Sequence, residues 1–207
     1  MAKQKKNRAD ILLLKSGLCS TVEDARKKIM AGLVRVGNDF VVRNTSEMFY
    51  ENTVFTMDQS CRYVSRGAFK LLPAMDKYLP DLTGKKAVDI GASTGGFTDL
   101  MLQKGAKKVY AIDVGYGQLH LRLRQDSRVV CMEKINARYF SDDSLPEKVD
   151  VLTMDVSFIS VTKILPAVSK VLLPSSWAFV LIKPQFEAER CNVEKGGVVK
   201  NVEVIND

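Results

Sequence analysis

The sequence predicts an α/β fold: a parallel sheet with helices on both faces, preceded by a small α+β module. Two observations lead to the sheet. From residue 84 onward short apolar segments alternate with helical segments, and a glycine-rich turn follows the first of them. A third observation leads to the module, because the first 60 residues carry two helical patterns and then short alternating ones.

The N-terminal segment predicts two short helices that end at Gly17 and Gly32. Residues 33–36 and 40–42 then alternate around Gly37-Asn38-Asp39, which is typical of a hairpin, and residues 53–55 predict one more strand.

Five strands are predicted in the larger part of the chain, over residues 86–90, 109–113, 129–132, 149–155 and 178–183. We therefore divide the chain into a domain over 7–60, a basic linker over 61–70 and a second domain over 71–207.

The charge distribution favours an anionic partner. The formal net charge is +7, and the first 43 residues hold ten Lys and Arg against four acids. No apolar run reaches the ~18 residues that would span a bilayer, and no signal peptide follows Met1. We therefore expect a cytoplasmic protein without a membrane partner. Four scattered cysteines and a single histidine predict neither a metal site nor a disulfide framework.

The glycine-rich turn after residues 86–90 predicts a cofactor loop. Gly91, Gly95 and Gly96 lack a Cβ, so the backbone N–H groups there can approach a ligand closely. Asp89 stands at the carboxyl end of the strand, where open α/β sheets bind ligands. A tight strand-to-helix turn without a ligand is the alternative interpretation.

The spacing of this turn indicates which cofactor binds. The pattern is D-x-G-x-x-x-G-G, not the G-x-G-x-x-G of dinucleotide sites, and its acid would repel a phosphate. S-adenosylmethionine has no phosphate, and its ammonium and carboxylate suit an acid beside bare amides. Asp113, at the end of the next strand, would meet the ribose hydroxyls. We expect the cofactor-binding set to be Asp89, Gly91, Ser93, Gly95, Gly96, Phe97, Asp113 and Asn136. Asn136 is the candidate for the adenine end, with an ordinary polar loop residue as the alternative.

Three ionisable residues stand where chemistry would be done: Lys70 before the sheet, and Asp155 and Lys183 at the ends of two strands. Methyl transfer to a hydroxyl requires that the acceptor oxygen be held in line and lose its proton. A lysine can take that proton when a second cation and desolvation favour its neutral form, while an aspartate fixes its geometry and opposes the shift. A surface ion pair is the alternative for Asp155 and Lys183.

Several motifs together resemble the TlyA family, described as hemolysins or as ribosomal RNA 2′-O-methyltransferases with an FtsJ-like catalytic domain. They are Ser65-Arg66-Gly67-Ala68-Phe69-Lys70-Leu71, Asp89 to Asp99, Val114-Gly115-Tyr116-Gly117-Gln118-Leu119, Asp155-Val156-Ser157-Phe158-Ile159-Ser160 and Lys183-Pro184-Gln185-Phe186-Glu187. The resemblance implies a Rossmann-like S-adenosylmethionine methyltransferase fold. Such a sheet normally has seven strands, so we expect the C-terminal hairpin to be missing here.

The resemblance also implies a catalytic Lys-Asp-Lys-Glu tetrad, of which Lys70, Asp155 and Lys183 are present. Lys183 would activate the 2′-hydroxyl, and Asp155 and Lys70 would position it. The closing Glu would lie beyond Asp207. Arg62-Tyr63-Val64 would relay RNA binding to the catalytic cleft.

The N-terminal segment is similar to the α-L-type RNA-binding domain of ribosomal protein four and of pseudouridine synthases, on Gly17-Leu18, Ala25, Arg26, Ile29, Gly32, Val34, Val36 and Gly37. The resemblance implies ribosomal RNA or ribosomal subunits as the partner, with no obligate protein partner. The expected RNA-binding residues are Arg8, Arg26, Lys27, Lys28, Arg35, Arg62 and Arg66. A helical hairpin with a solvated basic face is the alternative.

Two other functions compete with this one. A non-catalytic RNA-binding assembly factor would keep the fold without turnover. A membrane-active hemolysin would need a long amphipathic or spanning segment, whereas the longest apolar runs are explained as strands.

Overall fold

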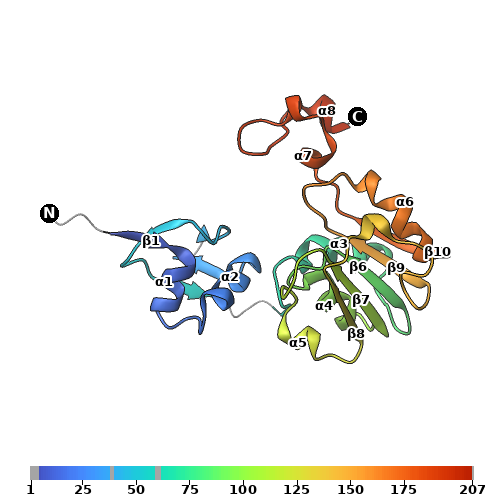
Figure 1. Cartoon of the computed structure of the whole chain (residues 1–207), viewed down its shortest axis with the longest axis horizontal. Coiled ribbons are helices and arrows are strands. Elements are labelled where there is room, and N and C mark those ends of the chain that lie inside the picture. The colour runs from blue at the N-terminus through green and yellow to red at the C-terminus, as the bar shows by residue number, and fades with distance from the viewer. Residues whose placement is uncertain (1–4, 38–39, 59–61, 207) are drawn as a thin grey trace.

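The computed structural model describes residues 5–37, 40–58 and 62–206. The expected turn at Asn38-Asp39 and the first residue of the expected linker, Cys61, lie outside these ranges. The described chain forms an N-terminal module and a larger α/β body, and its C-terminal segment stands away from the sheet of that body (Figure 1). No helix of the described residues has the length and apolarity that a membrane span requires.

The N-terminal module combines two helices with short antiparallel strands. Its elements are β1 (Lys6–Arg8), α1 (Ala9–Lys15), α2 (Val22–Met30), β2 (Val34–Val36), β3 (Phe40–Val41), β4 (Met48–Tyr50) and β5 (Phe55–Met57). Strand β2 lies between β3 and β5, and β1 pairs with β4. Both expected helices are present. The strand expected over 53–55 begins only at Phe55, and the β1–β4 pair was not predicted.

Helix α2 illustrates why these elements form. The Thr21 side chain caps it by accepting a hydrogen bond of 3.0 Å from the backbone N–H of Asp24. Ala25 and Ile29 lie one turn apart on the same face and are buried in the core of the module. The opposite face carries the charged residues. The module therefore has a core of its own, built on α1, α2 and the short strands.

The larger body is built on one parallel sheet of five strands in the order β10-β9-β6-β7-β8. The strands are β6 (Lys86–Ile90), β7 (Lys108–Asp113), β8 (Val129–Glu133), β9 (Val149–Met154) and β10 (Leu172–Val180). The predicted α/β fold with a parallel sheet is confirmed, and four of the five strands lie within one residue of the expected ends.

Side chains alternate between the two faces of this sheet. Ala87, Val109 and Val151 face one side and pack with α3 (Ala68–Tyr78) and α4 (Gly96–Gln103), while Val88, Tyr110 and Leu152 face the other. The first face is also covered by α5 (Leu121–Arg124), and the second by η1 (Ala137–Tyr139), η2 (Val161–Lys163), α6 (Leu165–Val168) and η3 (Ser169–Val171). Helices on both faces were expected.

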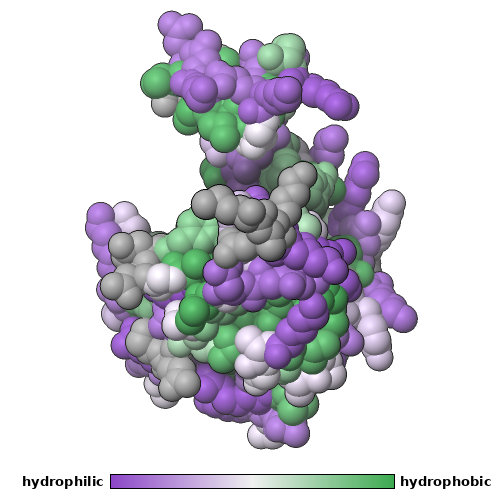
Figure 2. All heavy atoms as spheres, turned by 90° about the vertical axis from the view of Figure 1, so that its left-hand side faces the viewer, coloured by the Kyte–Doolittle hydropathy of each residue, from purple (hydrophilic) through white to green (hydrophobic). Residues whose placement is uncertain are grey.

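Strand β10 differs from its prediction. It begins at Leu172 and ends at Val180, whereas residues 178–183 were expected. Pro184 has no backbone N–H and opens the next helix, so the chain leaves the sheet before Lys183. Beyond it lie α7 (Pro184–Glu187), η4 (Arg190–Asn192) and α8 (Val202–Asn206). Figure 2 shows this C-terminal segment above the rest of the molecule.

Candidate active site

Two lysines from distant parts of the chain meet at one carboxylate. Lys70 lies in the first turn of α3, Asp155 directly follows β9, and Lys183 precedes α7. Lys70 Nζ donates a hydrogen bond of 2.8 Å to Oδ2 of Asp155. Lys183 Nζ lies 2.6 Å from Oδ1 of the same carboxylate. The three residues selected from the sequence for catalysis therefore form one cluster.

The Asp155 carboxylate is held in its charged form. Burial raises its pKa, but hydrogen bonds and positive charge from Lys183 and Lys70 outweigh the burial and leave the pKa below its ordinary value. Its backbone N–H donates a hydrogen bond of 3.0 Å to the carbonyl of Ile90 on the neighbouring strand, which fixes its place at the sheet edge. The carboxylate is therefore a fixed anion between two cations.

The loop after β6 passes close to this cluster. Gly91 has a φ of +80°, and a Cβ there would lie 2.6 Å from the backbone oxygen of Asp155. Only glycine tolerates both the left-handed backbone and this approach. The missing Cβ at Gly91 thus lets the loop pack against the end of β9, and its expected role in binding the cofactor stays a prediction.

Gly95 and Gly96 also permit close chain packing. A Cβ at Gly95, where φ is +96°, would lie 2.2 Å from a methyl carbon of Leu123. A Cβ at Gly96 would lie 2.5 Å from the hydroxyl of Ser65 and 2.9 Å from the backbone nitrogen of Ala68. These two glycines therefore seat the loop against α5 and against the start of α3.

Asp113 organises the loop from the end of β7. One carboxylate oxygen accepts a hydrogen bond of 2.8 Å from the N–H of Ser93, and the other accepts one of 2.7 Å from the N–H of Gly115. Ser93 itself has a φ of +48°. The carboxylate expected to meet a ribose thus also joins two loops and fixes the wall of the cleft.

Asp89 is a buried acid beneath the loop. Only 1% of it is exposed, and its oxygens accept hydrogen bonds from the hydroxyls of Thr98 (2.7 Å) and Thr153 (2.9 Å). Burial raises its pKa to about 6, although the two hydroxyls oppose the shift. The Asp89 carboxylate is therefore already hydrogen-bonded within the protein, to the hydroxyls of Thr98 and Thr153.

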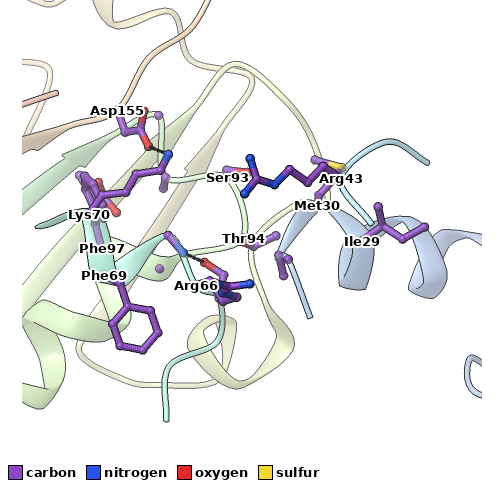
Figure 3. A pocket seen from close by; sticks show the side chains of 18 of the residues that line it. Ile29, Met30, Arg43, Arg66, Phe69, Lys70, Ser93, Thr94, Phe97 and Asp155 are labelled. Carbon is purple, nitrogen blue, oxygen red and sulfur yellow. Dashed lines mark hydrogen bonds and ion pairs between the residues drawn. The ribbon is translucent and has the colours of Figure 1, made fainter. Parts of the chain in front are cut away.

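Two cavities meet at Asp155. One, of about 490 Å³, is lined by Lys70, by the loop from Gly91 to Phe97 and by the end of α2 (Figure 3). The other, of about 460 Å³, is lined by Asp113, Asn136 and apolar side chains that include Ile90, Ile112 and Ile135. Both contain Gly91, Ser93 and Asp155.

The second cavity fits S-adenosylmethionine. Its volume is within the range of small-molecule sites, and it combines apolar walls for an adenine with the Asp113 carboxylate for ribose hydroxyls. Asn136 lies in its wall, where its side-chain oxygen also caps η1 by accepting from the N–H of Arg138. Phe97 is buried and lines the first cavity only.

Most of the expected RNA-binding residues have acidic partners. Arg8 and Arg26 both bind the fully buried carboxylate of Asp10, at 2.7 and 2.9 Å. Lys27 pairs with Glu23, Lys28 with Asp24, and Arg35 with Asp58. Arg62 lies over the ring of Tyr63, and Arg66 lines the first cavity. The seven residues therefore do not form one continuous unpaired patch.

Two residues at the site were not selected from the sequence. Ser157 accepts a hydrogen bond of 2.8 Å from Lys183 Nζ and so helps to fix that lysine. Phe158 is 91% exposed, has a φ of +65°, and borders the second cavity. Its ring centroid lies 5.2 Å from that of Phe186. Both residues belong to the motif that begins at Asp155, so their position beside it was the available signal.

Comparison with known proteins places this geometry in a family. The family model described as FtsJ-like methyltransferase matches residues 63–206. The chain is 39% identical over 194 residues to the 16S/23S rRNA (cytidine-2′-O)-methyltransferase TlyA of Mycobacterium tuberculosis, covering 93% of this chain and 72% of that protein. It is 41% identical over 195 residues to Hemolysin A of Brachyspira hyodysenteriae, covering 94% of this chain and 81% of that protein.

The chain is also similar to a solved structure. The hemolysin-like protein of Streptococcus thermophilus is 42% identical, with a TM-score of 0.70, and the match covers 98% of this chain and 74% of that chain. Family, fold and the cofactor cleft thus point to one class of enzyme. The chain belongs to the TlyA group of the FtsJ-like methyltransferase family, enzymes that depend on S-adenosylmethionine.

Proposed function

We propose that this chain transfers a methyl group from S-adenosylmethionine to a ribose 2′-hydroxyl of ribosomal RNA. The observation that carries the proposal is the Lys70–Asp155–Lys183 cluster at the junction of two cavities, one suited to the cofactor and one open to a substrate. The name of the Mycobacterium tuberculosis relative supports ribosomal RNA and the 2′-oxygen.

The residues of the cofactor cleft divide the binding task. Asp113 would accept hydrogen bonds from the ribose hydroxyls of the cofactor, and Asn136 would lie at its adenine end. Gly91, Ser93, Gly95, Gly96, Phe97 and Asp89 would shape the loop at its methionine end. When bound, S-adenosylmethionine supplies an electrophilic methyl group on a sulfonium.

The cluster supplies what the acceptor needs. Lys183 would take the proton of the 2′-hydroxyl, and the oxygen so activated would accept the methyl group that bound S-adenosylmethionine supplies. Asp155 and Ser157 hold Lys183 in place through contacts of 2.6 and 2.8 Å. Lys183 must be neutral to take a proton. Lys70 then remains as the positive charge that pairs with the Asp155 carboxylate. A lysine held in this way would accelerate the reaction as a general base.

The Phe158 ring is placed to stack on a nucleobase of the RNA. Its ring is almost fully exposed at the border of the cofactor cavity, three residues after Asp155. An exposed aromatic face stacks on an unpaired base without reading its sequence. A nucleotide extruded from its RNA helix would then present its ribose to Lys183.

We further propose that residues 7–60 form an α-L-type RNA-binding domain, residues 61–70 a linker and residues 71–207 the methyltransferase domain. The separate core of the module supports this division. Arg8, Arg26, Lys27, Lys28, Arg35, Arg62 and Arg66 would contact the RNA backbone, with the surface ion pairs exchanged for phosphates. The partner would be ribosomal RNA or a ribosomal subunit, and the enzyme would act in the cytoplasm.

The experiment measures tritiated methyl transfer from S-adenosylmethionine to separated ribosomal subunits. Subunits from a strain that lacks this gene are the substrate, and subunits from the parent strain, whose target is already methylated, are the matched control. We expect label only in the first, recovered as a 2′-O-methyl nucleoside after complete digestion. Cofactor binding without label would contradict the proposal and favour a non-catalytic assembly factor.

A further inference from the structure

The cavity of about 490 Å³ beside the catalytic cluster has walls from both parts of the molecule. Residues 29–32 at the end of α2, together with Val41 and Arg43, form the wall from the N-terminal module. Residues 65–70 and Asp155 form the wall from the methyltransferase body. The N-terminal module therefore lies beside the methyl-transfer centre and borders its substrate cavity.

Two arginines line this cavity. Among the residues that the structure describes, neither Arg43 nor Arg66 has an ion pair or a side-chain hydrogen bond to another residue. The other arginines of the module differ, because Arg8 and Arg26 bind Asp10 and Arg35 binds Asp58. Figure 3 shows the Arg43 side chain extending from the module toward Ser93, with Arg66 also at the cavity. Their positive charges are available to a ligand.

The acids of the same cavity do not neutralise these arginines. Asp155 is engaged by Lys70 and Lys183, and Asp89 is buried under hydrogen bonds from two threonines. Lys70 is paired with Asp155, so the guanidinium groups of Arg43 and Arg66 are the cations of this cavity wall that remain to bind an anion. Arginine forms paired hydrogen bonds to phosphate oxygens more readily than lysine does.

The packing of the two parts fixes Arg66. Its backbone N–H donates a hydrogen bond of 3.1 Å to the carbonyl of Ala31 at the end of α2. Its side-chain stem runs over Gly32, where a Cβ would lie 3.5 Å from the Arg66 Cδ. The turn after α2 therefore orients Arg66, and the same module supplies Arg43.

We propose that Arg43 and Arg66 bind one phosphodiester group of the RNA strand that carries the acceptor ribose. This rests on the proposed RNA methyltransferase function and adds to it a residue, Arg43, outside the expected RNA-binding set. The N-terminal module then does more than anchor the enzyme to distant RNA. It supplies one half of the clamp that places the acceptor nucleotide against Lys183.

The test is a double-mutant cycle with a defined probe. A fluorescein-labelled, random-sequence, single-stranded RNA of 12 nucleotides is titrated with wild type, Arg43→Gln, Arg66→Gln and the double variant over a series of KCl concentrations. Arg128→Gln is the matched control, because Arg128 precedes β8 at the opposite edge of the sheet and pairs with Asp126. S-adenosylmethionine affinity and thermal unfolding are measured for each variant to show that the fold and cofactor site are intact.

One shared phosphate predicts non-additive effects. Each single variant weakens RNA binding about tenfold but leaves the phosphate neutralised by the other arginine, so its salt slope changes little. The double variant reduces the slope by ~0.7, the value for one phosphate on a single strand. The double variant loses less affinity than the product of the two single losses, and Arg128→Gln equals wild type. Losses that multiply, with a slope reduced by ~1.4, would overturn the shared site, as would single variants that bind like wild type. A wild type that does not bind this probe at low salt also overturns it.

Methyl transfer to ribosomal subunits separates this inference from the function on which it rests. We expect Arg43→Gln to raise KM about tenfold with little change in kcat, because the arginine binds substrate without touching the reacting atoms. If wild type binds the RNA probe but labels no subunit, the proposed function fails while the phosphate clamp stands. If wild type labels the subunits and the arginine variants match it in KM and salt slope, the clamp fails.

Discussion

Lys70 donates a 2.8 Å hydrogen bond to Asp155, although the two residues stand 85 positions apart in the chain. One comes from the first turn of α3 and the other from the end of β9. This contact joins the segment before the sheet to the sheet itself. Because Lys183 occupies the other oxygen of the same carboxylate, the position of Asp155 depends on both lysines.

Lys70→Gln should slow the chemical step more than it weakens substrate binding. The variant keeps a hydrogen-bond donor but removes the cation that balances Asp155 when Lys183 is neutral. We expect kcat to fall at least tenfold, with KM for RNA and the affinity for S-adenosylmethionine within about threefold of wild type. Steady-state kinetics and calorimetric titration measure these quantities. An equal loss in Lys70→Arg would show that side-chain shape, and not charge, is what the site requires.

Lys183→Ala should abolish methyl transfer while the cofactor still binds. The variant removes the group that takes the hydroxyl proton, a contribution of about 10²–10⁴ in rate. S-adenosylmethionine affinity should stay within a few fold, because Lys183 contacts Asp155 and Ser157. Lys170→Ala is the control, since Lys170 precedes β10 and so lies at the other end of the strand that Lys183 follows. Near-normal turnover in Lys183→Ala would remove this lysine from the mechanism.

Most of the sheet was predicted from the sequence because β6, β7, β8 and β9 are short, largely apolar runs and a glycine-rich turn follows β6. The β1–β4 pair was not predicted, because Lys6–Arg8 is polar and its partners lie 40 to 44 residues further along the chain. The end of β10 was placed too late because Ile182 continues the apolar pattern, whereas the path of the chain is set by Pro184.

Lys70, Asp155 and Lys183 were selected from motifs and lie together in the structure, but their surroundings depend on packing between distant segments. Nothing in a linear pattern says that the Arg66 stem runs over Gly32 or that Arg43 lines the same cavity as Lys70. The glycines show the same limit. Their presence in the loop was an evident signal, yet at Gly95 and Gly96 the space is filled by Leu123 and Ser65. The sequence shows which residues lack a Cβ, and only the fold shows whether a neighbouring group occupies that space.

Asp89→Asn should gain stability relative to wild type as the pH rises. Burial raises the Asp89 pKa to about 6 from 3.8, so the folded state holds a proton that the unfolded state releases between these values. Stability therefore falls as pH rises through this window. We expect the free energy of unfolding of Asp89→Asn, relative to wild type, to gain about 2 kcal/mol between pH 4.5 and pH 7.5. Urea unfolding at both pH values measures the gain, and parallel changes in the two proteins would contradict the raised pKa.

Asp99→Asn should loosen the segment before α3. Asp99 is 3% exposed, and its carboxylate accepts hydrogen bonds from the backbone N–H of Val64 (2.7 Å), from Gln103 (3.0 Å) and from Arg122 (2.5 Å). Every partner is a donor, so an amide nitrogen in place of one oxygen would face a donor and leave Arg122 without its counter-charge. We expect a loss of about 1–3 kcal/mol in the free energy of unfolding.

The same substitution should expose this segment to protease. Trypsin cleaves after arginine, and Arg62 and Arg66 flank the residues that Asp99 holds in place. Cleavage there should be several-fold faster in Asp99→Asn than in wild type. Asp126→Asn is the matched control, because Asp126 forms a surface pair with Arg128 and touches no part of the segment. If Asp99→Asn loses stability without faster cleavage at these two arginines, Asp99 supports α4 and α5 and does not restrain the segment.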